Sequence, residues 1–225
     1  MTQSFETLKN ACRDQWQAYI QHPFVAGISE ATLPAEAFRH YLQQDYLFLI
    51  HFARAWGLAV YKSRDMAELR HSLENLKTIV DTEMGLHVDY CRTWGIDQEQ
   101  LQNLPEAQET LAYTRFVLDC GHRGELLDLH VAMAPCLIGY AEIADWIGSR
   151  AQTVTVDNPY QAWIDMYRDE EYQQAAQRER AWLDERLAEV SPARFAQLIT
   201  TFRDATRLEA AFWQMGLDAA QSTTH

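Results

Sequence analysis

Glycine and proline are scarce in this sequence, with nine Gly and six Pro among 225 residues. Folds built from many short strands need frequent turns, and these two residues are the usual turn formers. Their scarcity therefore argues against a many-turned all-β fold and for long helices. No strand-like alternation of useful length, internal repeat or low-complexity segment is present either.

Positive charge is also in short supply, because 19 Lys and Arg face 32 Asp and Glu for a net charge of -13. Such a surface repels nucleic-acid backbones and anionic membranes, so we predict neither as a partner. No uncharged apolar run approaches the ~20 residues that span a bilayer. The first residues lack the apolar core of a signal peptide. We therefore expect a soluble, cytoplasmic protein.

Closely spaced cysteine pairs are missing as well, and so are histidines in the last third of the sequence before its final residue. The four cysteines (Cys12, Cys91, Cys120 and Cys136) form no CxxC motif, which indicates reduced thiols. No histidine lies between His130 and the C-terminal residue, so a histidine-bearing di-iron cluster is not expected. Glu83 and His87, four residues apart, fit half of a metal site, but an exposed helix pair is the commoner explanation. We expect no metal and no cofactor.

Amphipathic helices are what the sequence does contain. Hydrophobic residues make up 48% of it, including seven Trp, ten Tyr and nine Phe. Apolar residues recur every three or four positions in successive segments, as on the buried face of a helix. The segments are 4–21, 34–62, 65–94, 105–120, one helix containing Cys136, one starting at Asn158-Pro159, 169–190, and one from Pro192 to near Gly216. Seven or eight helices with short connections predict a single all-α helical bundle over residues 1–225.

Three of these apolar faces each carry one misplaced reactive group, namely Asp45, Cys136 or Glu209. Cys136 also stands one turn before Tyr140 and directly after Pro135, whose missing N–H disturbs the helical hydrogen bonding. Each group has an ordinary structural explanation. A buried aspartate can tie two helices together, and most buried cysteines are inert.

Together, however, the three groups suggest a pocket that holds a nucleophile and two carboxylates. Tyr113, Tyr140 and Tyr167 also lie on apolar faces and would wall such a pocket with aromatic rings. This is what chemistry on a small aromatic ring needs. The walls stack on the ring, a carboxylate binds its nitrogens, and a thiolate attacks carbon. One of the carboxylates could take the thiol proton.

Five motifs follow one another along the chain: Gln44-Asp45-Tyr46, Tyr113 ahead of a Gly-x-x-Gly-Glu-Leu break, Ala134-Pro135-Cys136 with Tyr140, Tyr160-x-x-Trp163-Ile164-x-x-Tyr167, and Glu209. In this order, and over essentially the whole chain, they resemble the TenA family (thiaminase II, aminopyrimidine aminohydrolase). The resemblance implies a haem-oxygenase-like all-α fold, usually a homotetramer, without haem or metal.

The same resemblance implies a reaction and a set of site residues. The reaction is hydrolysis of 4-amino-5-aminomethyl-2-methylpyrimidine to its hydroxymethyl counterpart and ammonia in thiamin salvage, with thiaminase II activity on thiamin. Cys136 is then the nucleophile, Glu209 the acid and base, and Asp45 the residue that binds the exocyclic amino group. The pocket-lining residues are Phe48, Tyr113, Tyr140 and Tyr167.

Two other functions remain open at this point. One is an oxidase or oxygenase on the same scaffold, similar to pyrroloquinoline quinone synthase, which metal analysis would distinguish. The other is a non-catalytic protein that binds pyrimidine or thiamin, in which Cys136→Ser would keep its binding. The sequence does not rank the aminopyrimidine against its formylated precursor, thiamin or damaged thiamin as the preferred substrate.

Overall fold

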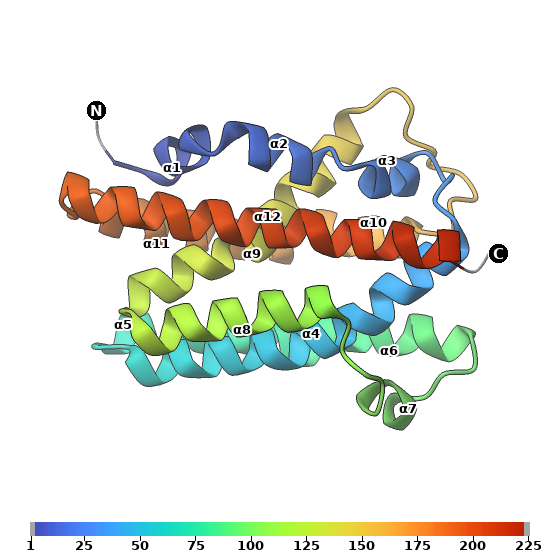
Figure 1. The fold of residues 1–225 in the computed structure, drawn as a ribbon, viewed down its shortest axis with the longest axis horizontal. Helices are drawn as coiled ribbons and strands as arrows, with labels where there is room; N and C mark the ends of the chain where they lie inside the picture. Colours follow the sequence, from blue (N-terminus) through green and yellow to red (C-terminus); the bar gives the residue numbers. More distant parts are fainter. Residues whose placement is uncertain (1–2, 223–225) are drawn as a thin grey trace. The chain divides into compact units, whose positions relative to one another are not determined.

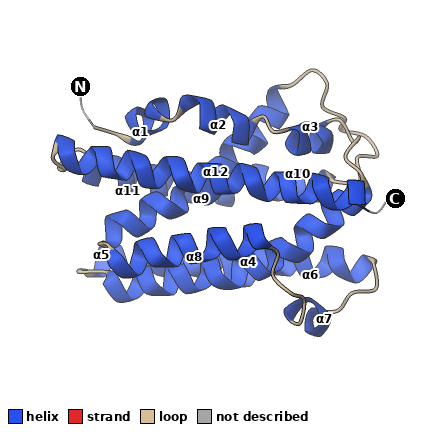
Figure 2. Ribbon diagram, in the orientation of Figure 1, coloured by secondary structure: helices blue, strands red, loops and turns tan. Residues whose placement is uncertain are grey.

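The computed structural model describes residues 3–222, and these residues form helices joined by loops and turns, with no strand among them (Figures 1 and 2). The elements are α1 (Phe5–Ala11), α2 (Arg13–Ile20), α3 (Pro23–Ser29), α4 (Ala35–Lys62), α5 (Met66–Thr78), the π-helix η1 (Ile79–Glu83), α6 (Met84–Thr93), α7 (Gln98–Gln102), α8 (Gln108–Arg123), α9 (Leu126–Ser149), α10 (Gln161–Arg168), α11 (Glu170–Leu187) and α12 (Pro192–Ser222). The prediction of an all-α fold is confirmed.

These elements divide into two compact units. Among the described residues, unit 1 holds residues 3–34 together with His130–Gln214, and unit 2 holds Ala35–Leu129 together with residues 215–222. The boundaries at 129/130 and 214/215 fall inside α9 and α12. The expectation of a single domain over residues 1–225 stays a prediction.

Unit 1 is built around aromatic contacts between its N-terminal helices and α12. The rings of Phe5 in α1 and Trp16 in α2 lie 5.5 and 5.3 Å from the ring of Phe202 in α12. All three side chains are buried. Such ring pairs stabilise a core beyond the area they bury, so these contacts hold α1 and α2 against α12.

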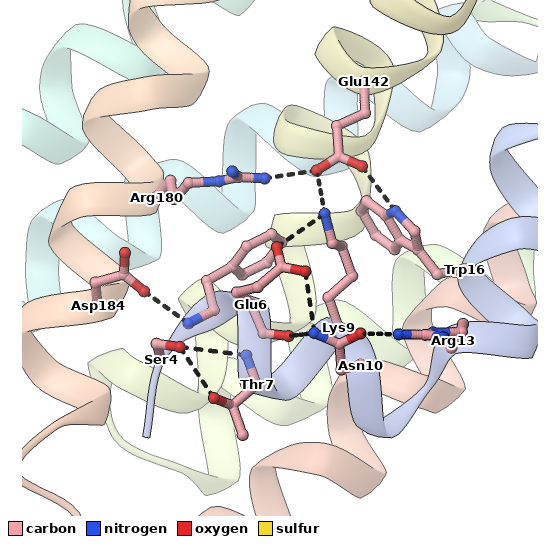
Figure 3. A network of polar contacts seen from close by, with 11 residues as sticks. Ser4, Glu6, Thr7, Lys9, Asn10, Arg13, Trp16, Glu142, Arg180 and Asp184 are labelled. Atoms are coloured by element: carbon pink, nitrogen blue, oxygen red, sulfur yellow. Dashed lines mark hydrogen bonds and ion pairs between the residues drawn. The ribbon is translucent and has the colours of Figure 1, made fainter. Parts of the chain in front are cut away.

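A polar network at Glu142 ties α1 and α2 to α9 and α11 (Figure 3). The Glu142 carboxylate accepts hydrogen bonds of 2.9 Å from Lys9 Nζ and from Trp16 Nε1. Arg180 of α11 donates to the same carboxylate. Two cations therefore balance this half-buried charge, which would otherwise be costly to withdraw from water.

Unit 2 is organised around α4, which packs against α5, α6 and α8. The amphipathic pattern predicted for this helix is confirmed, because six stripe residues are buried: Phe38, Tyr41, Asp45, Phe48, Phe52 and Trp56. The helix begins at Ala35, one residue after the start of the predicted span 34–62. At its other end, Lys62 Nζ donates a 2.9 Å hydrogen bond to the carbonyl oxygen of Gly124.

The structure corrects the prediction of one continuous helix over 65–94. Asp65 caps its start and Gly95, with φ +74°, follows its end, as expected. Between these ends the π-helix η1 interrupts the α-helical hydrogen bonding, since Met84 N–H bonds the carbonyl of Ile79 five residues back. Such insertions often mark functional sites.

Other boundaries also differ from the sequence prediction. The helix expected over 4–21 is broken at Cys12, where φ is -122° and ψ is 28°. The loop expected before Pro34 contains α3, whose first turn is capped by His22 Nδ1 and started by Pro23. The last helix continues through Gly216 to Ser222 instead of ending near that glycine.

Among the described residues, one helix, α9, is long and apolar enough to cross a membrane. Of its most apolar window, 83% is buried inside the protein. A helix that forms the core of a soluble protein has this same composition, so α9 is weak evidence for a membrane span.

Candidate active site

Cys136 lies on α9 with its side chain buried, and the peptide groups beside it are held by two tyrosines of unit 1. Tyr19 donates a 3.1 Å hydrogen bond to the carbonyl oxygen of Pro135, and Tyr172 donates one of 3.3 Å to that of Leu137. The helix continues on both sides of Pro135. These bonds fix the backbone immediately before and after the thiol.

Tyr140 and Tyr167, both predicted site residues, are brought together in unit 1. Their ring centroids are 4.7 Å apart, and the ring of Tyr140 lies 5.4 Å from that of Trp213 in α12. Trp163 packs edge-on against Tyr167 at 4.7 Å. These rings therefore form a packed aromatic cluster contributed by α9, α10 and α12, while the wall predicted from Tyr113, Tyr140 and Tyr167 together stays a prediction.

Glu209 is buried on α12, where it stands one turn before Trp213. Cys136 likewise stands one turn before Tyr140 on α9, and residues four apart share a helix face. Because Tyr140 and Trp213 touch, Cys136 and Glu209 lie on the faces of α9 and α12 that meet.

Asp45 in unit 2 is buried and bonded through one oxygen. Its Oδ2 accepts a 2.9 Å hydrogen bond from the hydroxyl of Tyr41 and lies 2.6 Å from Nε2 of His87 in α6. The aspartate thus ties α4 to α6, which is the structural role considered from the sequence. This role engages only one of its two carboxylate oxygens.

His87 is completely buried, and its other ring nitrogen, Nδ1, lies 2.7 Å from the carbonyl oxygen of Glu83. Burial lowers the pKa of His87, but the charge and hydrogen bond of Asp45, helped by Glu83, outweigh burial and raise it. The interpretation of Glu83 and His87 as an exposed helix pair is wrong, since both side chains are buried.

Phe48 and Tyr113, the remaining predicted pocket residues, stack on each other in unit 2. Their centroids are 4.9 Å apart at an interplanar angle of 27°. Gln44 anchors the start of α8 to α4, because its Oε1 accepts bonds of 2.8 Å from Thr110 Oγ1 and 2.9 Å from the backbone N–H of Ala107. This anchor positions Tyr113 one turn further along α8.

His87 is the residue of this network that sequence reasoning did not assign to the site. The signal was its four-residue spacing from Glu83, which suggested a metal ligand or a surface pair. Its actual partner is Asp45, 42 residues earlier in the chain, and only tertiary packing reveals that contact.

The comparison with solved structures defines the class of fold. A domain from Shewanella denitrificans, described as having a heme oxygenase-like fold, matches with a TM-score of 0.74 over 98% of this chain and 95% of its own, at 11% identity. At that identity the likeness concerns the fold alone. The fold is therefore the haem-oxygenase-like all-α fold, as the resemblance implied.

Within that class, the model of the TENA/THI-4/PQQC family matches residues 9–219, and the chain belongs to this family. It is 36% identical to the aminopyrimidine aminohydrolase of Halalkalibacterium halodurans over 89% of each protein. A crystal structure described as a TenA family transcription regulator from Silicibacter sp. TM1040 matches with a TM-score of 0.88 at 44% identity, over 95% of this chain and 96% of that one. These relationships confirm the predicted family and the predicted class of enzyme, a hydrolase.

Proposed function

We propose that this hydrolase converts 4-amino-5-aminomethyl-2-methylpyrimidine and water to 4-amino-5-hydroxymethyl-2-methylpyrimidine and ammonia. We further propose that it cleaves thiamin at the same methylene carbon, in thiamin salvage. The name of the Halalkalibacterium halodurans relative supports the substrate class. The observation that carries the proposal is the buried thiol of Cys136, one turn from a tyrosine packed on Tyr167 and Trp213.

In the proposed mechanism the thiol of Cys136 gives its proton to a carboxylate and adds as thiolate to a carbon of the pyrimidine ring. Addition breaks the aromaticity, and the electron pair of the ring expels the protonated amine from the methylene carbon. Water then adds to the exposed methylene and loses a proton. Expulsion of the thiolate restores the ring, so the cysteine is regenerated and the overall reaction is a hydrolysis.

Glu209 is proposed as the acid and base of this sequence. It protonates a ring nitrogen as the thiolate adds, and it later takes the proton from the attacking water. Its burial supports the role, because a carboxyl group shielded from bulk water exchanges protons with a bound ligand rather than with solvent.

Asp45 is proposed to accept a hydrogen bond from the exocyclic amino group, and the aromatic rings are proposed to hold the pyrimidine by stacking. The stacked pair of Phe48 and Tyr113 supports this second role, as does the contact between Tyr140 and Tyr167. Aromatic faces recognise a flat ring without demanding a particular pattern of hydrogen bonds.

The test is ammonia release from the aminopyrimidine by metal-free wild type, Cys136→Ser and Glu209→Ala, with folding followed by circular dichroism. We expect turnover in the wild type and its collapse in both folded variants. Cys120→Ala is the matched control, since Cys120 is equally buried and lies on α8. It should retain turnover.

Two other results would assign a different function. Pyrimidine binding without turnover, unchanged in Cys136→Ser, would indicate a binding protein. Turnover that needs added metal and oxygen would indicate an oxidase or oxygenase. Parallel assays with thiamin, the formylated precursor and damaged thiamin rank the substrates.

We also propose that the protein is a cytoplasmic homotetramer that works without metal or cofactor. The resemblance to TenA proteins supports the assembly, and a net charge of -13 supports a location away from anionic membranes. Sedimentation equilibrium measures the mass of the assembly directly. A tetramer of 26.1 kDa chains has four times the mass of one chain.

A further inference from the structure

We infer that His87 is a positioning residue that holds Asp45 by Oδ2 and leaves Oδ1 for the amino group of a bound aminopyrimidine. The inference extends the proposed function, and it rests on that function for the identity of the ligand. The arrangement of the carboxylate itself rests only on contacts within unit 2.

The hydrogen bonds of Asp45 are strongly one-sided. Tyr41 donates to Oδ2 at 2.9 Å and His87 Nε2 lies 2.6 Å from the same atom. No hydrogen bond from any other residue in the range 3–222 reaches Oδ1. An ionised carboxylate has about four acceptor positions, two on each oxygen. Two protein groups have therefore taken one oxygen, and the other keeps its acceptor capacity for a ligand.

The partners of the imidazole define where its protons are. A backbone carbonyl only accepts hydrogen bonds, so Nδ1, at 2.7 Å from the oxygen of Glu83, carries a hydrogen. Nε2 then either donates to an ionised Asp45 or accepts from a protonated one. The negative charges of Asp45 and Glu83 favour the first arrangement, because both act on the ring of His87.

The proton on Nε2 matters because an amino group needs an acceptor. By donating to Oδ2, Nε2 holds the carboxylate in place and leaves Oδ1 to accept from the exocyclic amine. Without His87, only the hydrogen bond from Tyr41 would restrain the rotation of the carboxylate about its terminal bond. His87 thus orients, together with Tyr41, the group that would bind the pyrimidine.

The π-helix η1 explains why the histidine reaches this position. Buried residues follow each other at intervals of four from Asn75 through Ile79, Glu83, His87 and Cys91. In a regular α-helix each such step drifts by about 40° around the axis, which would carry the last of them to the far side. The wider turn of η1 absorbs part of the drift. It therefore keeps Glu83 and His87 turned inward.

The first measurement is independent of catalysis. Protein labelled with ¹⁵N-histidine reports by NMR whether each imidazole nitrogen of the ligand-free enzyme carries a hydrogen. We expect both nitrogens of His87 to be protonated at pH 7 in the wild type and the Asp45→Asn variant to return the ring to its neutral form. His87→Gln assigns the signal, and His122→Gln, at an exposed position of α8, is the control. A neutral His87 in the folded wild type would overturn the inference.

The second measurement is the affinity for the hydroxymethylpyrimidine product, by calorimetry between pH 6 and 9. We expect His87→Leu to weaken binding about tenfold or more, because it removes the group that orients Asp45. His87→Gln, which keeps a donor, should recover part of the loss, and KM should change more than kcat. Equal affinity of folded His87→Leu and wild type would overturn the inference. Failure of the wild type to bind any pyrimidine would instead contradict the proposed function. The NMR measurement would still test whether His87 donates a hydrogen bond to Asp45.

Discussion

The phenolic hydroxyl of Tyr19 donates a 3.1 Å hydrogen bond to the carbonyl oxygen of Pro135, the residue before the proposed nucleophile. The same ring leaves no room for a side chain at position 139, where a Cβ atom would come within 2.5 Å of Cε1 of Tyr19. Gly139 therefore permits α2 to approach α9 closely enough for this hydrogen bond to form.

This approach predicts the effect of Gly139→Ala on stability. The added methyl group overlaps the buried Tyr19 ring, so we expect the free energy of unfolding to fall by about 1–3 kcal/mol. Tyr19→Phe removes only the hydrogen bond and should cost about 1 kcal/mol. Urea denaturation measures both. Gly85→Ala is the control, because nothing lies within 4 Å of a Cβ there. It should stabilise α6 by up to about 1 kcal/mol, and a smaller loss in Gly139→Ala than in Tyr19→Phe would contradict the steric argument.

A second prediction concerns the buried pair of His130 and Glu179. Nδ1 of His130 lies 2.8 Å from Oε1 of Glu179, and the ring stacks on Trp182 with centroids 3.9 Å apart. Glu179→Ala leaves a polar ring without this partner in the core, so it should lower the unfolding free energy by about 1–3 kcal/mol. Glu179→Gln keeps an acceptor and should cost less. Glu185→Ala, at an exposed position of the same helix, should stay within about 0.5 kcal/mol of the wild type.

The four thiols should differ in reactivity. Burial raises the pKa of Cys91 and that of Cys120 to about 11, and it also raises the pKa of Cys12. At pH 7.5 these three remain protonated and poorly nucleophilic. We expect iodoacetamide to inactivate the enzyme through Cys136, as located by mass spectrometry of a digest, and the pyrimidine product to slow the modification. Loss of wild-type activity in step with the modification of a different cysteine in the digest would point to that residue instead.

Stability should also depend on pH through His87, whose pKa is raised in the folded protein by Asp45 against the opposing effect of burial. The folded state holds its proton above pH 6.5, where the unfolded chain releases it. The resulting stabilisation is complete below pH 6.5 and is lost as pH rises through the folded pKa, with a slope of at most about 1.4 kcal/mol per pH unit. Denaturation of wild type and His87→Leu at pH 6, 7, 8 and 9 measures it. A stability difference that does not change with pH would show that His87 takes up no proton on folding in this range.

Much of the helical framework was predictable because the sequence carries it locally. The stripes of α4 and α12 recur every three or four residues, and the buried positions of Phe48 and Phe202 follow from that period alone. The burial of Asp45 and Glu209 was equally visible, since each interrupts an aromatic face. A charged residue that interrupts an apolar helix face in the sequence is therefore expected to be buried with that face in the fold.

Features that depend on tertiary contacts were not predictable in the same way. The π-helix η1 spans only five residues, so its extra residue per turn is too local a change to stand out from the apolar pattern of the helices around it. The short helix α3 has only seven residues, too few to show a period. The hydrogen bond between His87 and Asp45 joins two elements far apart in the sequence. The residues around His87 contain no pattern that would predict Asp45 as its partner.

The division of the chain into two units has a consequence for how such a protein can be rearranged. Each unit is made of two separate stretches of sequence, and two of the three crossings between units lie inside α9 and α12. A deletion or a gene fusion that cuts only in loops therefore cannot remove one unit whole. Recombination between relatives at loop positions would exchange parts of both units at once. The two units are therefore expected to be inherited together.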